Sequence, residues 1–443
     1  MRRSEPLAGG HGRYASARAA VWGLRGWPLS LMLFLQLAAC ATRPQRTGGG
    51  VDDPRVPLTI VPSEAAAESY AAEAAPGPPP DPFAIQLKAE LDRLMKQLGR
   101  PRLVEDARFD RVARDIARVT AAENVSAANV ITFLLAYYGV VEPEPNLILM
   151  RGGAGSENAA IVDLGKQFAQ IPAASAWRRV GIGLWRSGQT WNAVLALQEH
   201  NLSLDPLPRA LPSGGRVAIA GRILGLYRSP QVLITSPRGA VHSLPTQVQG
   251  KAFRAELQCT LGDGSYQVEV TADDQRGPTV LANFPLFCGI VPPTAVRVVA
   301  DEKASSSNPE EIESQILDLL DRDRTANGLP ALVRDARLSR VARAYSREMA
   351  DNGEVGHFSQ RSGNAVDRVR AAGVSPMPTT VAENVGRGYS AAEAERGFMS
   401  SPGHRENILG RMVTHIGIGV AIGRREGDAM PIFVTQLFAG WGQ

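Results

Sequence analysis

Apolar residues recur at helical spacing in the last third of the chain, where two long helices are predicted. The first is expected to begin at Asn308, a good N-cap, with Pro309 in the first helical position. Its apolar face consists of Ile312, Ile316, Leu319 and Leu320. The second has an apolar face at Leu338, Val341, Ala342, Tyr345 and Met349. This second helix is expected to end near Gly353.

Shorter elements complete this C-terminal region. They are helices over 364–372 and 390–400 and strands over 413–422 and 430–439. Ser390 and Glu393 have the spacing of a capping box at the start of the second of these helices. Helices on both sides of a small antiparallel sheet give residues 308–443 a three-layer α/β/α fold.

Between residues 205 and 295 the apolar positions alternate with polar ones instead. Short β-prone runs cover 216–222, 231–235, 251–257, 266–270 and 280–287. Turns such as 262–264 separate these runs, a pattern typical of a small antiparallel β-sandwich. No residue of this region looks catalytic, so we expect a spacer or adhesion role for it.

An internal repeat relates the C-terminal region to an earlier part of the chain. Residues 99–114 match residues 328–343 at most positions without a gap, and 179–184 match 414–420. Because both matches come in the same order at similar spacing, residues 83–204 are expected to share the fold of the C-terminal region. This first copy has no histidine before its last residues, so we expect a degenerate copy with a structural or interaction role. The fold class predicted for the chain is therefore α/β, with a β-sandwich between two related copies.

The N-terminus predicts export. Basic residues precede a short apolar run that suits a signal peptide over 1–39. The run ends in Leu37-Ala38-Ala39-Cys40, which resembles a bacterial lipobox, whose cysteine becomes the lipidated first residue of the mature protein. In that case Cys40 anchors the chain to a membrane of the bacterial cell envelope, facing the periplasm or the cell surface. The alternative is an ordinary secretory signal followed by a chance cysteine.

The segment after Cys40 and the two other cysteines extend this picture. Residues 40–82 are rich in Pro, Ala, Gly and Glu and are predicted to form a disordered tether. Cys259 and Cys288 both lie in the β-prone region. An exported chain meets oxidising conditions, so a disulfide between them is expected, with two buried thiols as the alternative.

Composition narrows the function classes. The chain has 443 residues, of which 44% are apolar and 21% charged, values normal for globular domains. Its net charge is only +4, and its arginines are scattered rather than clustered, so nucleic acid is not an expected partner.

Three short C-terminal motifs carry the candidate chemistry. They contain His357, Glu383 and His404, and the last of these lies in the string SPGHRENIL over 401–409. Two imidazoles and a carboxylate can bind zinc or another divalent cation, or polarise a water, so these are the candidate catalytic and metal-binding residues. We expect them to converge in one open pocket. The alternative is that both histidines hydrogen-bond to backbone across a cleft and pin its loops.

The order of these motifs over 308–443 resembles the bacterial branch of the CAP superfamily, which joins cysteine-rich secretory proteins, venom antigens and plant pathogenesis-related proteins. The resemblance implies an α-β-α sandwich with a central cleft. It also implies cleft residues at His357, Glu383 and His404, which bind a divalent ion in some members. The chain departs from the eukaryotic pattern, because Ser401 stands where those members have a second glutamate and Phe398 where they have tryptophan.

Three functions are consistent with this sequence. The favoured one is a non-enzymatic binding module on the cell envelope, whose ligand is an envelope protein, a glycan or a lipid. The second is a metal-assisted hydrolase acting on envelope peptides or polymers, with Glu383 as base or ligand. The third, allowed by the family resemblance, is capture of a sterol or fatty acid.

Overall fold

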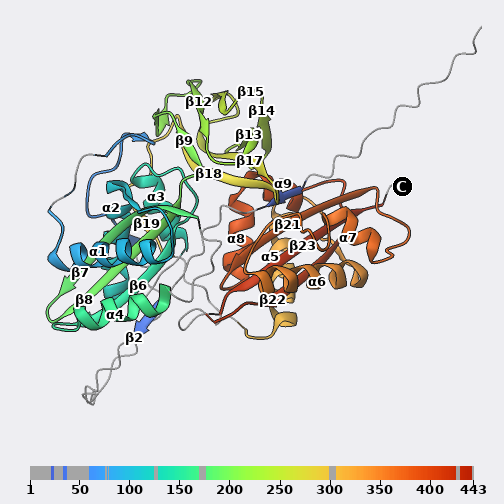
Figure 1. Cartoon of the computed structure of the whole chain (residues 1–443). Helices are drawn as coiled ribbons and strands as arrows, with labels where there is room; N and C mark the ends of the chain where they lie inside the picture. Colours follow the sequence, from blue (N-terminus) through green and yellow to red (C-terminus); the bar gives the residue numbers. More distant parts are fainter. Residues whose placement is uncertain are drawn as a thin grey trace, which may run out of the picture.

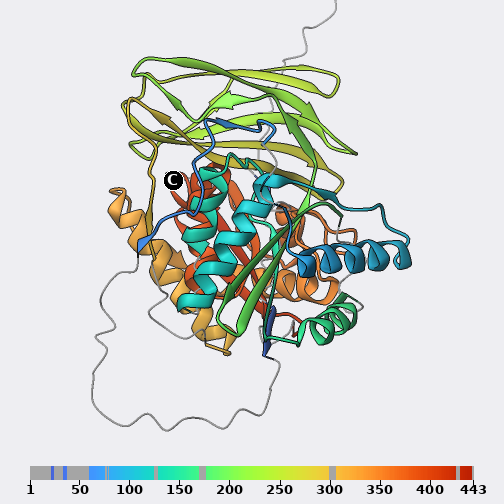
Figure 2. The ribbon, with the colours of Figure 1, turned by 90° about the vertical axis from the view of Figure 1, so that its left-hand side faces the viewer.

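The computed structural model describes residues 21–23, 33–36, 59–74, 77, 79–123, 128–168, 176–298, 306–425 and 430–441. Figure 1 shows three modules within these residues: two α/β modules and, above them in this view, an all-β module. Figure 2 shows the same β module across the top after a quarter turn. No helix in the described ranges is long and apolar enough to cross a membrane.

The C-terminal module places four strands of a five-stranded sheet between two helical layers. Its strands, in sheet order, are β21 (Thr380–Gly388), β23 (Ile432–Gly440), β22 (His415–Ile422) and β20 (Val333–Arg334). Its helices are α5 (Pro309–Ala326), α6 (Ala336–Asn352), α7 (Ala365–Ala371), α8 (Ala391–Ser400) and α9 (Pro402–Ile408). α5 and α8 pack on the sheet face that carries Ile416 and Val434, while α6 and α7 pack on the opposite face. The predicted three-layer fold is confirmed, but the sheet is mixed rather than antiparallel, because β20 pairs in parallel with β22.

Local sequence explains where these helices begin and end. The Asn308 side chain accepts a hydrogen bond from the Glu310 amide at 3.0 Å, and Pro309 occupies the first turn of α5. α6 ends at Gly353, whose φ of 68° is readily available to glycine. Ser390 caps α8 through the Glu393 amide at 3.0 Å.

The first module repeats this topology. Its strands, in the corresponding sheet order, are β6 (Asn146–Gly153), β8 (Thr190–Glu199), β7 (Trp177–Ser187) and β5 (Val104–Glu105). Its helices are α1 (Pro82–Gln97), α2 (Ala107–Glu123), α3 (Ala128–Tyr137) and α4 (Glu157–Phe168). A Cβ added at Gly181 would lie 2.2 Å from α2 backbone, and one at Gly417 would lie 2.2 Å from α6 backbone. The same close helix–strand approach in both copies confirms the predicted duplication.

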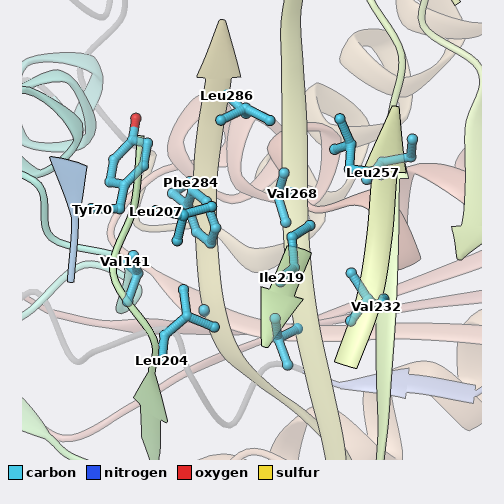
Figure 3. Packing of buried hydrophobic residues seen from close by; sticks show 14 of the residues in the cluster. Tyr70, Val141, Leu204, Leu207, Ile219, Val232, Leu257, Val268, Phe284 and Leu286 are labelled. Carbon is cyan, nitrogen blue, oxygen red and sulfur yellow. The ribbon is translucent and has the colours of Figure 1, made fainter. Parts of the chain in front are cut away.

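The β module between the copies is a sandwich of two sheets, as predicted, and the strands pair antiparallel except at residues 210–211, which pair in parallel with residues 287–288. One sheet contains β14 (Val241–Leu244), β13 (Arg228–Thr235), β17 (Gly264–Asp274), β18 (Gly277–Cys288) and β11 (Ala210–Leu211). The other contains β15 (Thr246–Gln249), β16 (Ala252–Gln258), β12 (Arg216–Ile223) and β9 (Leu202–Leu204). Apolar side chains such as Ile219, Val268 and Leu286 fill the space between the sheets (Figure 3).

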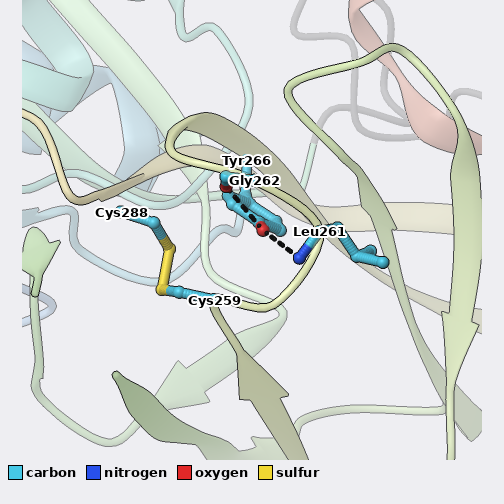
Figure 4. Close-up of a disulfide and its surroundings, with 5 residues drawn as sticks. All are labelled: Cys259, Leu261, Gly262, Tyr266 and Cys288. Carbon is cyan, nitrogen blue, oxygen red and sulfur yellow. Dashed lines mark hydrogen bonds between the residues drawn. A yellow bond between two sulfur atoms is a disulfide. The ribbon is translucent and has the colours of Figure 1, made fainter. Parts of the chain in front are cut away.

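A disulfide joins Cys259 to Cys288, with their Cα atoms 5.7 Å apart, at one end of this sandwich (Figure 4). The adjacent turn is fixed by the Tyr266 hydroxyl, which accepts from the Leu261 amide and donates to the Gly262 carbonyl, both at 2.9 Å.

The prediction of a disordered tether through residue 82 is wrong for its second half. β3 (Thr59–Ile60) pairs with β19 (Val296–Arg297), and β4 (Ser69–Tyr70) pairs with β10 (Leu207–Pro208). The Tyr70 side chain is fully buried in the core of the β module (Figure 3). The prediction rested on the mean composition of residues 40–82, which is polar. That mean does not reveal a few apolar side chains, such as Tyr70, that pack into the core of another module.

Two short strands come from the predicted signal peptide. β1 (Val21–Gly23) pairs in parallel with β21, and β2 (Leu33–Gln36) pairs in parallel with β6. Cys40 lies outside the described residues, so its lipidation stays a prediction.

Candidate functional site

The structure brings the three candidate residues together around β21 of the C-terminal sheet. His357 follows α6 in a loop, Glu383 lies in β21 and His404 lies in α9. All three are buried, with exposed fractions of 1%, 1% and 0%. The Asn384 side chain donates to the His404 carbonyl at 3.2 Å, which ties α9 to β21. Asn407 completes this brace by donating to the Glu383 carbonyl, also at 3.2 Å.

Glu383 orients His357. Its Oε2 lies 2.9 Å from His357 Nδ1, and its Oε1 accepts from Arg368 Nη2 at 2.6 Å. The Arg368 guanidinium also lies 3.3 Å from the centre of the Tyr345 ring, a cation–π contact that fixes it. Burial acts to raise the pKa of Glu383, but the Arg368 charge and the His357 hydrogen bond outweigh it and lower that pKa. The carboxylate is therefore ionised, and His357 donates its Nδ1–H to it.

His404 is held by a residue from another module. Its Nδ1 lies 2.7 Å from Ser401 Oγ, and this hydroxyl donates to Glu269 Oε2 at 2.5 Å. The other Glu269 oxygen accepts from the Gly403 amide at 3.1 Å. Glu269 belongs to β17 of the β module and is fully buried. Burial raises the pKa of Glu269 to about 7, against the effect of both hydrogen bonds.

The two imidazoles share one unusual property. Among the described residues, neither His357 Nε2 nor His404 Nε2 has a hydrogen-bond partner, although both atoms are buried. Burial lowers the pKa of each ring, and a charge on His357 lowers the pKa of His404 further. With both Nδ1 atoms carrying the proton, each Nε2 presents an unused lone pair.

The expected open pocket is closed in this structure. The turn between β17 and β18 covers the cleft, and a Cβ added at Gly277 would lie 3.2 Å from the His357 Cβ. The Arg276 carbonyl accepts from the His357 amide at 2.9 Å, and the Arg276 side chain forms an ion pair with Glu354. β17 contacts α9, and Figure 1 shows the β module reaching this helix. Sequence periodicity within the C-terminal region gave no indication that another module sits on the cleft.

The strands of the first copy carry apolar residues at the corresponding positions. Strand registers place Leu147 and Ile148 where the C-terminal copy has Glu383 and Asn384. In the described ranges of the first copy no helix corresponds to α9.

Sequence reasoning did not find Glu269 or Arg368. Glu269 alternates with Val268 and Val270, which face the core of the β module, so its position is that of a solvent-facing residue. Ser401 was recognised only as the place of a missing glutamate. The structure shows that the carboxylate reaching this place comes from residue 269, 132 positions away in the chain.

Residues 317–438 match the family model described as CAP, the cysteine-rich secretory protein family. The C-terminal module is a CAP domain, and the resemblance stated from the motifs is confirmed.

Two curated relatives come from Bacillus subtilis (strain 168). The uncharacterized protein YkwD is 35% identical over 129 residues, which cover 29% of this chain and 49% of YkwD. The uncharacterized membrane protein YlbC is 33% identical over 125 residues, which cover 28% of this chain and 35% of YlbC. The chain thus spans half or less of the length of these relatives. A crystal structure of an extracellular SCP-domain protein from Bacillus anthracis str. Ames is 23% identical, with a TM-score of 0.27, over 44% of this chain and 67% of that chain.

Proposed function

We propose that this chain is an exported envelope lipoprotein whose CAP domain is a binding module with a divalent cation, zinc being the expected ion, held by His357 and His404. The observation that carries the proposal is the pair of buried, unpartnered Nε2 atoms. Burying a polar atom without a partner is unfavourable, and a bound cation would satisfy both lone pairs at once. Neutral imidazole is a common zinc ligand.

The surrounding residues fit such a site. Metal-binding histidines usually donate their other ring N–H to a carboxylate or another acceptor, which fixes the tautomer. His357 Nδ1 faces the Glu383 carboxylate, and His404 Nδ1 faces the Ser401 hydroxyl oxygen. When bound, the cation would supply Lewis-acid character. Among the described residues no three His, Cys, Asp or Glu side chains form a ready metal cluster, so water or a ligand would complete the coordination.

Binding is favoured over hydrolysis because of what Glu383 does. Both of its oxygens are engaged, by His357 and by Arg368, and its pKa is lowered. A general base works best with a pKa near the operating pH, so Glu383 is poorly suited to activate water. Hydrolysis of envelope peptides remains the second candidate, and lipid capture the third.

Envelope attachment rests on the N-terminal sequence. The apolar run that ends at Cys40 supports export and lipidation, and the membrane is then the partner that Cys40 engages. Radiolabelled fatty acid incorporated by the wild type should be absent from Cys40→Ser. Label that persists in the variant would rule out this anchor.

The metal proposal is tested by elemental analysis of the purified full chain. We expect about one zinc per chain in the wild type and loss of that zinc in His357→Ala and His404→Ala. His415→Ala is the matched control, because His415 lies in the same domain but packs against Trp441 at the far side of the sheet. A wild-type chain without metal after zinc reconstitution, or equal loss in the control, would overturn the proposal.

A further inference from the structure

Glu269 is a buried acid that lies in a strand of the β module, but its side chain contacts the CAP domain. Its neighbours along β17, Val268 and Val270, pack inside the β module, so the Glu269 side chain points away from that core. Its hydrogen-bond partners across the module boundary are Ser401 and Gly403. The residue is fully buried between the two modules.

The hydrogen-bond roles along this chain of groups follow from the donors and acceptors present. An ionised carboxylate only accepts, so the Ser401 hydroxyl hydrogen points to Glu269 Oε2 and the Gly403 N–H to Oε1. With its hydrogen committed, Ser401 Oγ can only accept from His404 Nδ1, 2.7 Å away. The proton of the neutral ring is therefore on Nδ1, and Nε2 keeps its lone pair.

We propose that Glu269 is a positioning residue of the CAP cleft, which holds His404 as the Nδ1–H tautomer through Ser401. The His404 ring is then held in this tautomer only when the β module is docked, because Glu269 comes from that module. The effect on zinc rests on the proposed function, but the tautomer itself is a property of the metal-free chain.

Glu269→Gln tests the relay without changing the size of the side chain. The glutamine side chain has a single oxygen, which accepts the hydrogen bond from the Gly403 N–H. Its NH2 group then faces Ser401 Oγ and donates a hydrogen bond to it. The Ser401 hydrogen then turns to His404 Nδ1, and the ring proton moves to Nε2. The opposite amide orientation would set two donors, the glutamine N–H and the Gly403 N–H, against each other.

The readout is 15N NMR of histidine-labelled full chain, kept metal-free with chelator at about pH 8.5, where Glu269 is ionised. We expect His404 to be protonated at Nδ1 in the wild type and at Nε2 in Glu269→Gln. His357, held by Glu383, should keep its Nδ1 proton in both and serves as an internal reference.

Glu354→Gln is the matched control, because Glu354 pairs with Arg276 across the same module boundary without touching Ser401 or His404. It should leave the His404 tautomer unchanged. An Nε2-protonated His404 in the wild type, an unchanged tautomer in Glu269→Gln, or the same change in Glu354→Gln would overturn the proposal. If the chain binds zinc, Glu269→Gln should also weaken that binding by about 10–100-fold.

Discussion

The ion pair between Arg368 and Glu383 gives the sharpest stability prediction. In Arg368→Met the buried carboxylate loses the Arg368 guanidinium, 2.6 Å away, which is its charged partner among the described residues, and keeps the hydrogen bond from His357. The Arg368 and Glu383 side chains are only 5% and 1% exposed, so water cannot replace the lost partner. Arg368 also donates to the Gly363 carbonyl at 2.6 Å, and that bond is lost too.

The expected cost is large. Removing one member of a buried pair typically lowers the free energy of unfolding by about 3–5 kcal/mol, because an uncompensated charge is left behind. The loss should depend on pH. In the wild type the lowered pKa of Glu383 contributes stability that is present above the unfolded pKa of about 4.5 and is lost as pH falls through the folded pKa. In the variant, burial raises that pKa, so stability is lost as pH rises and the gap from wild type widens toward neutral pH.

The assay is native-state hydrogen exchange of the β21 and β23 amides, which reports opening of this domain in a chain of several modules. Arg370→Met is the matched control, because Arg370 lies in the same helix but forms an exposed pair with Asp367 at 3.4 Å. We expect a change of less than about 0.5 kcal/mol there. In a chain that already carries Glu383→Gln, Arg368→Met should lower the free energy of unfolding by less than it does in the wild-type chain. A loss below about 1 kcal/mol, or an equal loss in both backgrounds, would refute the reasoning.

Gly417→Ala and Gly181→Ala should each destabilise their own module by about 1–3 kcal/mol, since each added Cβ would lie 2.2 Å from helix backbone; unchanged hydrogen exchange would contradict this close packing. Burial raises the pKa of Glu395 to about 8, so its contribution to stability is full below about pH 4.5 and is lost as pH rises to about 8. Glu395→Gln should flatten that part of the pH–stability profile of the CAP domain, and a profile that keeps its slope would count against the assignment. Replacing Cys259 and Cys288 by serine should lower the stability of the β module by about 3–4 kcal/mol, because the disulfide closes a loop with a sequence separation of 29. A thermal transition of that module at its original temperature would show the disulfide to be dispensable.

Much of the fold could be predicted because each element carries its own local signals. The cap at Asn308, the stop at Gly353 and the apolar faces of α5 and α6 all act within a few residues. The duplication was visible because the same glycine and alanine positions are needed wherever a helix packs this closely on a strand.

β21 was missed as a strand because its central residues do not follow the usual pattern. Glu383 and Asn384 are polar but buried, and the network that satisfies them comes from Arg368, Asn407 and Gln436. A pattern of apolar and polar positions cannot distinguish such a strand from a loop, because it does not contain the partners.

The site was predicted in part for the same reason. Motif order was enough to bring His357, Glu383 and His404 together, but their roles depend on neighbours that are distant in sequence. Glu269 lies between two core-facing valines, which is the position of a solvent-exposed residue in a strand. It is buried because the β module docks on the CAP domain. The contact between modules, which the sequence does not show, decides which nitrogen of His404 is available.

The central claim is that His357 and His404 together hold a divalent cation beneath the β module. Anomalous diffraction at the zinc edge, from crystals of the full chain grown with zinc, tests it most directly. We predict one strong peak within bonding distance of Nε2 of both histidines, with Glu269 still bound to Ser401. Crystals that contain zinc elsewhere on the chain, while both Nε2 atoms remain unpartnered, would contradict the account.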